Sequence, residues 1–287
     1  MGVAVVAICV SSGPAFGAGV QVSLASSFTA DDVLRYSGAF TTPGIAYDNP
    51  TPGGGVDNWM LTQSAATALG GSGAVGINDN GFYPASGARL YDVQLGFTNA
   101  TPTGTNVAIR STATGSFTFN VPANYYSQFA IFGSGGSGNS TVTITLNYST
   151  GSPTVLNSVT LPDWYSGNPG TTAAGAAGTY FALTPAMARE AAYLFPGGGY
   201  QAPGTGAYIY GINLAPDSTR QLTSVQVAYT PGSVGYTIVN FLAAAGAVMA
   251  TTSVPTVPTL STWGLVLLAA GLSLVCWLML RRQRKAF

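Results

Sequence analysis

Two short segments combine the kinds of side chain that proteins use to hold a sugar. Asp57-Asn58-Trp59 and Asp163-Trp164-Tyr165, the second with Asn168 nearby, each place an aromatic ring beside a carboxylate or an amide. Aromatic faces suit the C–H surface of a sugar ring, while carboxylates and amides hydrogen-bond its hydroxyls. Both segments are therefore candidate carbohydrate-binding loops. The alternative is that the two tryptophans pack in a core and the aspartates cap turns.

Oxygen ligands for calcium also occur, at Asp48, Asn49, Asp79 and Asn80. Calcium prefers oxygen donors, but Asn78-Asp79-Asn80-Gly81 is equally typical of a plain turn. The turn is the simpler interpretation, so the sequence predicts no metal and no other cofactor.

Residue types for catalysis are absent or isolated. The chain has no histidine, and its single lysine, Lys285, lies near the C-terminal end, so a serine nucleophile would lack a base. Nine acidic residues are present, but none stands in the paired setting that glycoside hydrolysis requires. The glycine-rich runs 133–138 and 197–199 lack the Lys-Ser or Lys-Thr of a phosphate loop. We therefore expect that the protein is not an enzyme, with a glycan-active enzyme as an alternative.

Charge is scarce and unevenly distributed. Only 6% of the 287 residues are charged, against about a quarter in an ordinary soluble domain. Residues 18–258 hold nine acids and five arginines, a net charge of −4. The one basic cluster is at the C-terminal end, so a nucleic-acid partner, which needs a basic stripe, is not expected. The acidic region 18–258 and the basic C-terminal end are expected to meet different environments.

Alternation of apolar and polar residues with period two recurs along the chain and indicates strands. It predicts strands at 89–97, 116–121, 141–148, 155–161, 208–214, 225–229 and 236–244, with a hairpin turn at 149–153. A single short helix is expected at 185–194, with Thr184 as its N-cap. Many short strands with glycine-rich turns predict an all-β fold, namely a single β-sandwich of jelly-roll-like arrangement over residues 18–249.

The N-terminal end is apolar up to Val10 and continues to Ala15-Phe16-Gly17-Ala18. An apolar run followed by small residues is typical of a secretory signal peptide, which we place at residues 1–17. The alternative is an N-terminal core strand. Cys9 and Cys276 both lie in apolar segments outside residues 18–249, so this region contains no disulfide.

The C-terminal end carries an uncharged apolar run at 264–280, followed at once by Arg281, Arg282, Arg284 and Lys285. With Trp263 included, a helix over this run would be about 27 Å long, enough to span the hydrocarbon core of a bilayer. Basic residues hold their end of such a helix on the cytoplasmic side. The sequence thus predicts one C-terminal transmembrane helix, with the body outside the inner membrane. A buried core helix is the alternative.

A linker at 250–256 leads into Val257-Pro258-Thr259-Leu260-Ser261-Thr262-Trp263-Gly264. Together with the apolar run and the basic end, this segment resembles the IPTL-CTERM sorting signal, an Ile-Pro-Thr-Leu-Ser-x-Trp-Gly motif before one membrane helix and an arginine cluster. The resemblance covers 257–287, and Val257 stands where the family usually has isoleucine. The matched motif positions are Val257, Pro258, Thr259, Leu260, Ser261, Trp263 and Gly264.

The resemblance implies export in a Gram-negative bacterium and a membrane partner, an exosortase-like transpeptidase. Such an enzyme would remove the tail and transfer the body to the cell surface or extracellular matrix. Pro255 and Pro258 prevent a regular helix before the apolar run, so the motif is expected to stay extended and accessible. The alternative is a permanent single-pass anchor with a structural role.

Over residues 27–248 the chain is similar to galactose-binding-like jelly-roll modules. The similarity rests on Tyr91-Asp92-Val93, Leu161-Pro162-Asp163-Trp164 and Thr223-Ser224-Val225, among other short segments. It implies a carbohydrate-binding role with a polysaccharide partner. Taken together, the sequence predicts an exported surface or matrix protein whose body binds carbohydrate or packs with other surface components.

Overall fold

The computed structural model describes residues 19–40, 57–71, 76–97, 108–164, 177–192, 200–201, 207–232 and 238–249, with single positions 270, 271, 273, 277 and 281. The chain divides into two compact units, Met1–Ala250 and Thr251–Phe287. The predicted signal peptide at 1–17, the linker and the sorting motif at 257–264 lie outside the described residues.

Strands make up nearly all of the regular structure in the described part of the first unit, so the all-β prediction is confirmed. Two short helical segments interrupt them, η1 (Ala25–Ser27) and α1 (Gln63–Ala68). The strands are β1 (Gly19–Val22), β2 (Val33–Leu34), β3 (Asp57–Leu61), β4 (Phe82–Tyr83), β5 (Val93–Gln94), β6 (Ile109–Ser111), β7 (Gly115–Asn124), β8 (Tyr126–Gly136), β9 (Ser140–Tyr148), β10 (Thr154–Leu161), β11 (Tyr180–Ala192), β12 (Tyr200–Gln201), β13 (Ala207–Asn213), β14 (Leu222–Thr230) and β15 (Ile238–Val248).

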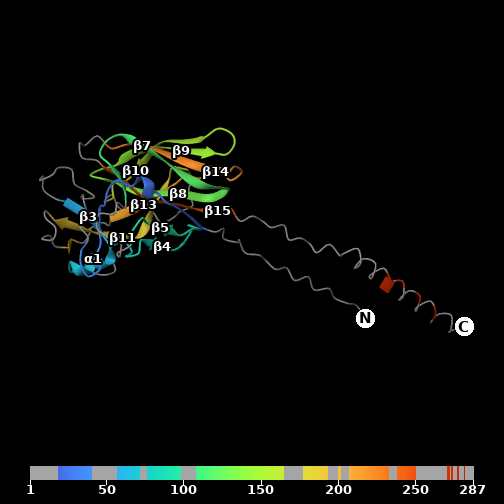
Figure 1. The fold of residues 1–287 in the computed structure, drawn as a ribbon, viewed down its shortest axis with the longest axis horizontal. Helices are drawn as coiled ribbons and strands as arrows, with labels where there is room; N and C mark the ends of the chain where they lie inside the picture. The colour runs from blue at the N-terminus through green and yellow to red at the C-terminus, as the bar shows by residue number, and fades with distance from the viewer. Residues whose placement is uncertain are drawn as a thin grey trace. The chain divides into compact units, whose positions relative to one another are not determined.

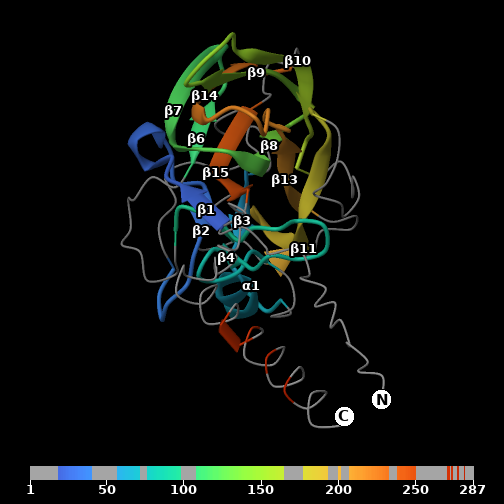
Figure 2. The same ribbon diagram turned by 90° about the vertical axis from the view of Figure 1, so that its right-hand side faces the viewer.

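Within the described residues the strands form a nine-stranded sheet, a four-stranded sheet and a two-stranded ribbon. The large sheet runs β1-β15-β8-β13-β11-β3-β2, with β6 beside β15 and β12 beside β11. The four-stranded sheet runs β10-β9-β14-β7, and β4 pairs with β5. Figures 1 and 2 show the four-stranded sheet on one side of β8, β13 and β15, with β4 and α1 toward the other side. The strand pairs are antiparallel except β2 with β3.

Each face of the large sheet covers its own apolar core. Between the two sheets, the inward residues of the four-stranded sheet pack on Phe129, Ile131 and Phe241. On the opposite face, Phe132, Ile209 and Leu242 pack with apolar side chains of the ribbon and its neighbouring loops. Burial of these two cores supplies the main driving force for folding in a unit that has few charges.

Sheet periodicity explains why most of the longer strands were predictable. In β9, Val142, Ile144 and Leu146 are fully buried, and the threonines between them point outward. This is the period of two that a half-buried strand requires. The predicted hairpin forms between β9 and β10, with a register shift between Leu156 and Val159. The segment 89–97 differs from its prediction, because only Val93–Gln94 forms a strand there.

The helix predicted at 185–194 is wrong, because its described residues, up to Ala192, belong to β11. The alanine-rich sequence favours a helix locally. However, β11 pairs first with β13 and then with β3 and β12, and these pairings override the local preference. Pro185 falls within the register shift between Leu183 and Met187. A proline is tolerated there because it has no ladder hydrogen bond to donate.

In the second unit, the five described residues, 270, 271, 273, 277 and 281, are all helical and exposed. The guanidinium of Arg281 lies over the ring of Trp277, 4.3 Å from its centroid. Among the residues that can be described, no helix has the length and apolar character needed to cross a membrane.

Candidate functional site

Trp59, the aromatic residue of the first predicted sugar-binding segment, lies in strand β3 and not in a loop. Its side chain is 7% exposed and packs in a small core with Leu34, Leu61 and two alanines of α1. Stacking on a sugar needs an exposed ring face, which Trp59 does not present. The side chains of Asp57 and Asn58, earlier in the strand, lie outside the described residues.

The second predicted segment is also built into the fold. Trp164 is fully buried in the core under the large sheet. The Asp163 carboxylate accepts a hydrogen bond from the Gly138 amide, and the Asp163 amide donates to Oδ1 of Asn139 at 2.8 Å. Asp163 thus fastens the turn between β8 and β9, as the turn alternative predicted. Tyr165 and Asn168 lie outside the described residues.

The oxygen ligands considered for calcium have structural partners where they are described. Oδ1 of Asp79 accepts from the Ser64 amide at 2.8 Å, and Oδ2 accepts from Oγ of Ser64 at 2.5 Å. Oδ1 of Asn80 accepts from the Phe82 amide at 3.0 Å and closes the turn. Asp48 and Asn49 lie outside the described residues. Among the described residues, no group of three or more acids and cysteines could hold a metal ion.

A cleft of about 430 Å³ opens beside α1. Its lining mixes one aromatic ring, hydroxyls, an amide and one carboxylate. These side chains come from α1 and from two segments on either side of it in the sequence. The lining residues are Tyr36, Gln63, Ser64, Thr67, Ala68 and Asp79.

Local capping explains why α1 sits at this cleft. The helix begins directly after β3, and Oγ1 of Thr62 accepts from the Ala65 amide at 3.3 Å. The chain then returns so that the backbone amide of Gln63 donates to the Ile77 carbonyl at 3.0 Å. Gly76 permits this return because its φ is +104° and an added Cβ would lie 2.9 Å from the Thr62 backbone. The result places Asp79 against the first turn of α1.

A cluster of charged side chains, which no sequence pattern had indicated, flanks β2 on both sides. Asp31, Asp32 and Arg35 are 4%, 0% and 0% exposed. Nη2 of Arg35 donates to Oδ2 of Asp31 at 2.6 Å. Neither carboxylate oxygen of Asp32 has a hydrogen-bond partner among the described residues. Two adjacent carboxylates are therefore enclosed with little hydrogen bonding to stabilise their charge.

Burial controls the protonation of both acids. It raises the pKa of Asp32 to about 7, although the charge of Arg110 acts in the opposite direction. Burial also raises the pKa of Asp31 to about 6, against the opposing charge of Arg35. Near neutral pH, Asp32 therefore exists in both protonated and ionised forms.

The large sheet continues this polar region across three strands. Asn240 of β15 is the register partner of Ser134 on β8 and of Arg110 on β6. Asn240 is fully buried, and neither side-chain atom finds a hydrogen-bond partner in the described part of the chain. Because Asp32, Ser134 and Asn240 are all at 0% exposure, this region affects stability and is not open to a ligand.

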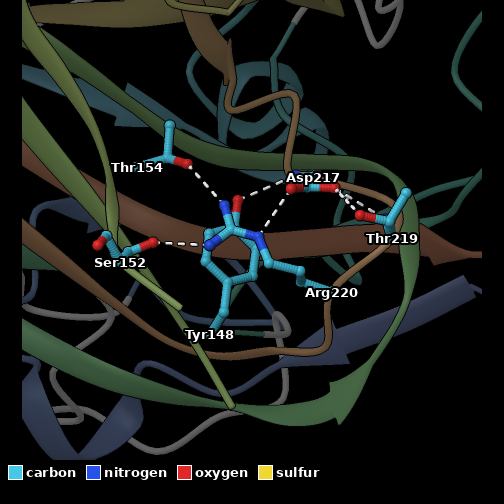
Figure 3. A network of polar contacts seen from close by, with 6 residues as sticks. All are labelled: Tyr148, Ser152, Thr154, Asp217, Thr219 and Arg220. Carbon is cyan, nitrogen blue, oxygen red and sulfur yellow. Dashed lines mark hydrogen bonds and ion pairs between the residues drawn. The ribbon is translucent and has the colours of Figure 1, made fainter. Parts of the chain in front are cut away.

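Arg220 is the centre of a separate network of polar contacts, shown in Figure 3. Its Nε donates to Oδ2 of Asp217 at 2.7 Å, and its Nη1 donates to the Ser152 carbonyl at 2.7 Å. Its Nη2 reaches Oγ1 of Thr154 at 3.4 Å. The guanidinium also lies 3.9 Å from the ring centroid of Tyr148. All three guanidinium nitrogens are thus used within the protein.

Asp217 completes that network. Its Oδ1 accepts from the amide and the hydroxyl of Thr219 at 2.9 and 2.6 Å, and its own amide donates to the Tyr148 hydroxyl at 2.9 Å. Hydrogen bonds from Thr219 and Arg220 lower the pKa of Asp217 to about 2. The network fastens the β9–β10 turn to the loop before β14, and we assign it a structural role.

Comparison of the chain with known protein families, with curated proteins and with solved structures finds no match. The geometry alone therefore selects the candidate site. The cleft beside α1 combines access with the donors and acceptors of a binding site, and we take it as the candidate site. Sequence reasoning considered Asp79 only as a turn or calcium residue, and it did not consider Tyr36 or Gln63.

Proposed function

We propose that the protein is exported across the inner membrane of a Gram-negative bacterium and sorted to the cell surface or extracellular matrix. The observation that carries this proposal is the fixed order at the C-terminal end. The motif at 257–264 comes first, then the apolar run at 264–280, then four basic residues at 281–285. The helical state of all five described tail positions and the separation of residues 251–287 from the body support it.

In this proposal the tail serves as a temporary membrane anchor. One transmembrane helix over 264–280 holds the motif at a fixed depth, with Trp263 at the headgroup level. Arg281, packed on the Trp277 ring, begins the cytoplasmic basic end. An exosortase-like transpeptidase then meets an extended peptide and transfers the body. A permanent single-pass anchor is the second way in which the same tail could act.

Mass spectrometry of the surface-released protein tests this proposal. Processing predicts a mature form without the basic end, so peptides that extend through Arg281 should be absent from it. Replacement of Val257-Pro258-Thr259-Leu260 by alanines should leave full-length protein in the membrane fraction. The matched control replaces linker residues 251–254 in the same way and should be processed normally. Full-length protein on the surface of unaltered cells would favour the permanent anchor.

For the body, we infer a non-catalytic carbohydrate-binding role on a jelly-roll-like sandwich. The scarcity of charge suits a neutral glycan better than an ionic partner. Four of the described acids are committed elsewhere, because Asp163 and Asp217 hold turns, and Asp31 and Asp32 are buried. A glycan-active enzyme, which needs two accessible carboxylates across one sugar bond, is the less supported alternative.

A further inference from the structure

We propose that the cleft beside α1 binds the terminal rings of a neutral saccharide. In this assignment Tyr36 is the stacking platform, and Gln63 and Asp79 bond the sugar hydroxyls. The inference deepens the carbohydrate-binding role proposed above and rests on it. It places that role on side chains different from those in the two tryptophan segments.

The aromatic platform is fixed before any ligand arrives. Tyr36 is half-buried and lines the cleft, and its ring centroid lies 4.8 Å from that of Phe40 at an interplanar angle of 56°. Both rings pack against the small core that contains Leu34 and Trp59. A ring held in this way loses little conformational entropy on binding, which favours affinity. Trp59 thus supports the site from beneath and does not contact the ligand.

The polar side chains of the cleft retain capacity for a ligand. The hydrogen bonds of Gln63 to described residues involve its backbone, and its side-chain amide can both donate and accept. Asp79 accepts twice from Ser64, which fixes its orientation, and a carboxylate has about four acceptor sites in all. Thr67 donates its hydroxyl proton to the Gln63 carbonyl and keeps its lone pairs as acceptors. Donors and acceptors beside a ring are the set that a polyhydroxylated ligand needs.

Charge and size narrow the class of ligand. Among the residues that the structure describes, the lining contains one carboxylate and no basic residue. An anionic sugar would be repelled by Asp79, and one carboxylate offers too few ligands for a cation such as calcium. The volume of about 430 Å³ lies in the range of small-molecule sites. A neutral saccharide of one or two rings fits these constraints.

The test measures binding of neutral di- and tetrasaccharides, with a uronate-containing tetrasaccharide as the charged probe, to the full-length protein by saturation-transfer NMR and calorimetry. The change Tyr36→Ala should weaken binding roughly tenfold or more, because stacking and buried ring area are lost. Tyr36→Phe should bind within about threefold of the unaltered protein, because the ring remains. The matched control is Tyr125→Ala, which removes a 42% exposed tyrosine between β7 and β8 and should leave affinity unchanged.

Gln63→Ala should also weaken binding, and unfolding midpoints will show that each variant is folded. If neutral saccharides bind but Tyr36→Ala and Gln63→Ala leave the affinity unchanged, the site assignment is overturned and the carbohydrate-binding role stands. If the uronate probe binds as well as the neutral ones, the assigned ligand class is overturned. If the folded protein binds no saccharide probe, both the site and the carbohydrate-binding role fail. None of these outcomes bears on sorting through the tail.

Discussion

At the scale of single residues, Asp31 and Asp32 are unusual because buried carboxylates normally have full hydrogen-bonding partners. Arg35 pairs with Asp31 at 2.6 Å, but both oxygens of Asp32 lack a hydrogen-bond partner in the part of the chain that is described. Removal of one member of a buried ion pair leaves an uncompensated charge and is strongly destabilising. The cluster therefore makes the stability of the body sensitive to its protonation state.

Stability should fall as the pH rises from 5 to 8. The pKa of Asp32 in the folded protein, about 7, lies above its value in the unfolded chain. The folded state thus binds more protons than the unfolded state in this window, so protonation favours folding. The loss is on the order of 3 kcal/mol for Asp32 alone, and Asp31 acts in the same direction. Urea unfolding at a series of pH values measures it.

Asp32→Asn is the variant that checks the cause. An amide cannot ionise, so the unfolding free energy of this variant should vary much less between pH 5 and 8. Asp217, whose lowered pKa contributes stability that is lost only as the pH falls through about 2, does not titrate in this window. An equally steep dependence in Asp32→Asn would show that other groups control the pH response.

At the scale of elements, α1 connects the fold to the candidate site, because its cap determines where Gln63 and Ser64 lie. Thr62→Ala should destabilise the protein by about 1 kcal/mol, since the Ala65 amide would lose its side-chain acceptor. It should also weaken saccharide binding. Chemical denaturation and calorimetry measure the two effects. Thr67→Ala removes an exposed hydroxyl from the same helix and should cost less stability.

The elements also show which parts of the fold the sequence could predict. The strands with a clear period of two, such as β7, β9, β10 and β14, were predicted. One face of each packs in a core and the other faces solvent, which produces the alternation in the sequence. The part of β11 from Pro185 to Ala192 was predicted as a helix, because its local sequence favours one. Pairing with strands distant in sequence overrides that preference. Strands of two residues, such as β2 and β4, are too short to show any period.

The candidate site escaped prediction for a related reason. Tyr36 follows β2, and Gln63 follows β3; the parallel pairing of these strands brings the two residues together. No periodic pattern or short motif records that pairing. Trp59 and Trp164 were predicted as ring platforms, whereas in the structure they fill cores. An aromatic residue in a sequence is more often a packing residue than a binding platform. The two roles are distinguished by how far the side chain is buried in the structure.

At the scale of the whole molecule, the chain divides after Ala250 into the body and residues 251–287. The two large apolar cores and the small core around Trp59 are formed by residues that precede this point, and strand β15 ends at Val248. We therefore expect the body to fold without residues 251–287. If sorting is the role of these residues, folding and delivery should be separable.

A chain truncated after Ala250 should fold with an unfolding free energy within about 0.5 kcal/mol of the body in the full-length protein. It should keep the same saccharide affinity, because Tyr36, Gln63 and Asp79 all precede the division. In cells, however, it should leave the membrane fraction and fail to reach the surface. Denaturation, calorimetry and cell fractionation measure these three outcomes. A truncated chain that reaches the surface in normal amounts would contradict the sorting role, and one that unfolds more easily would show that the tail stabilises the body.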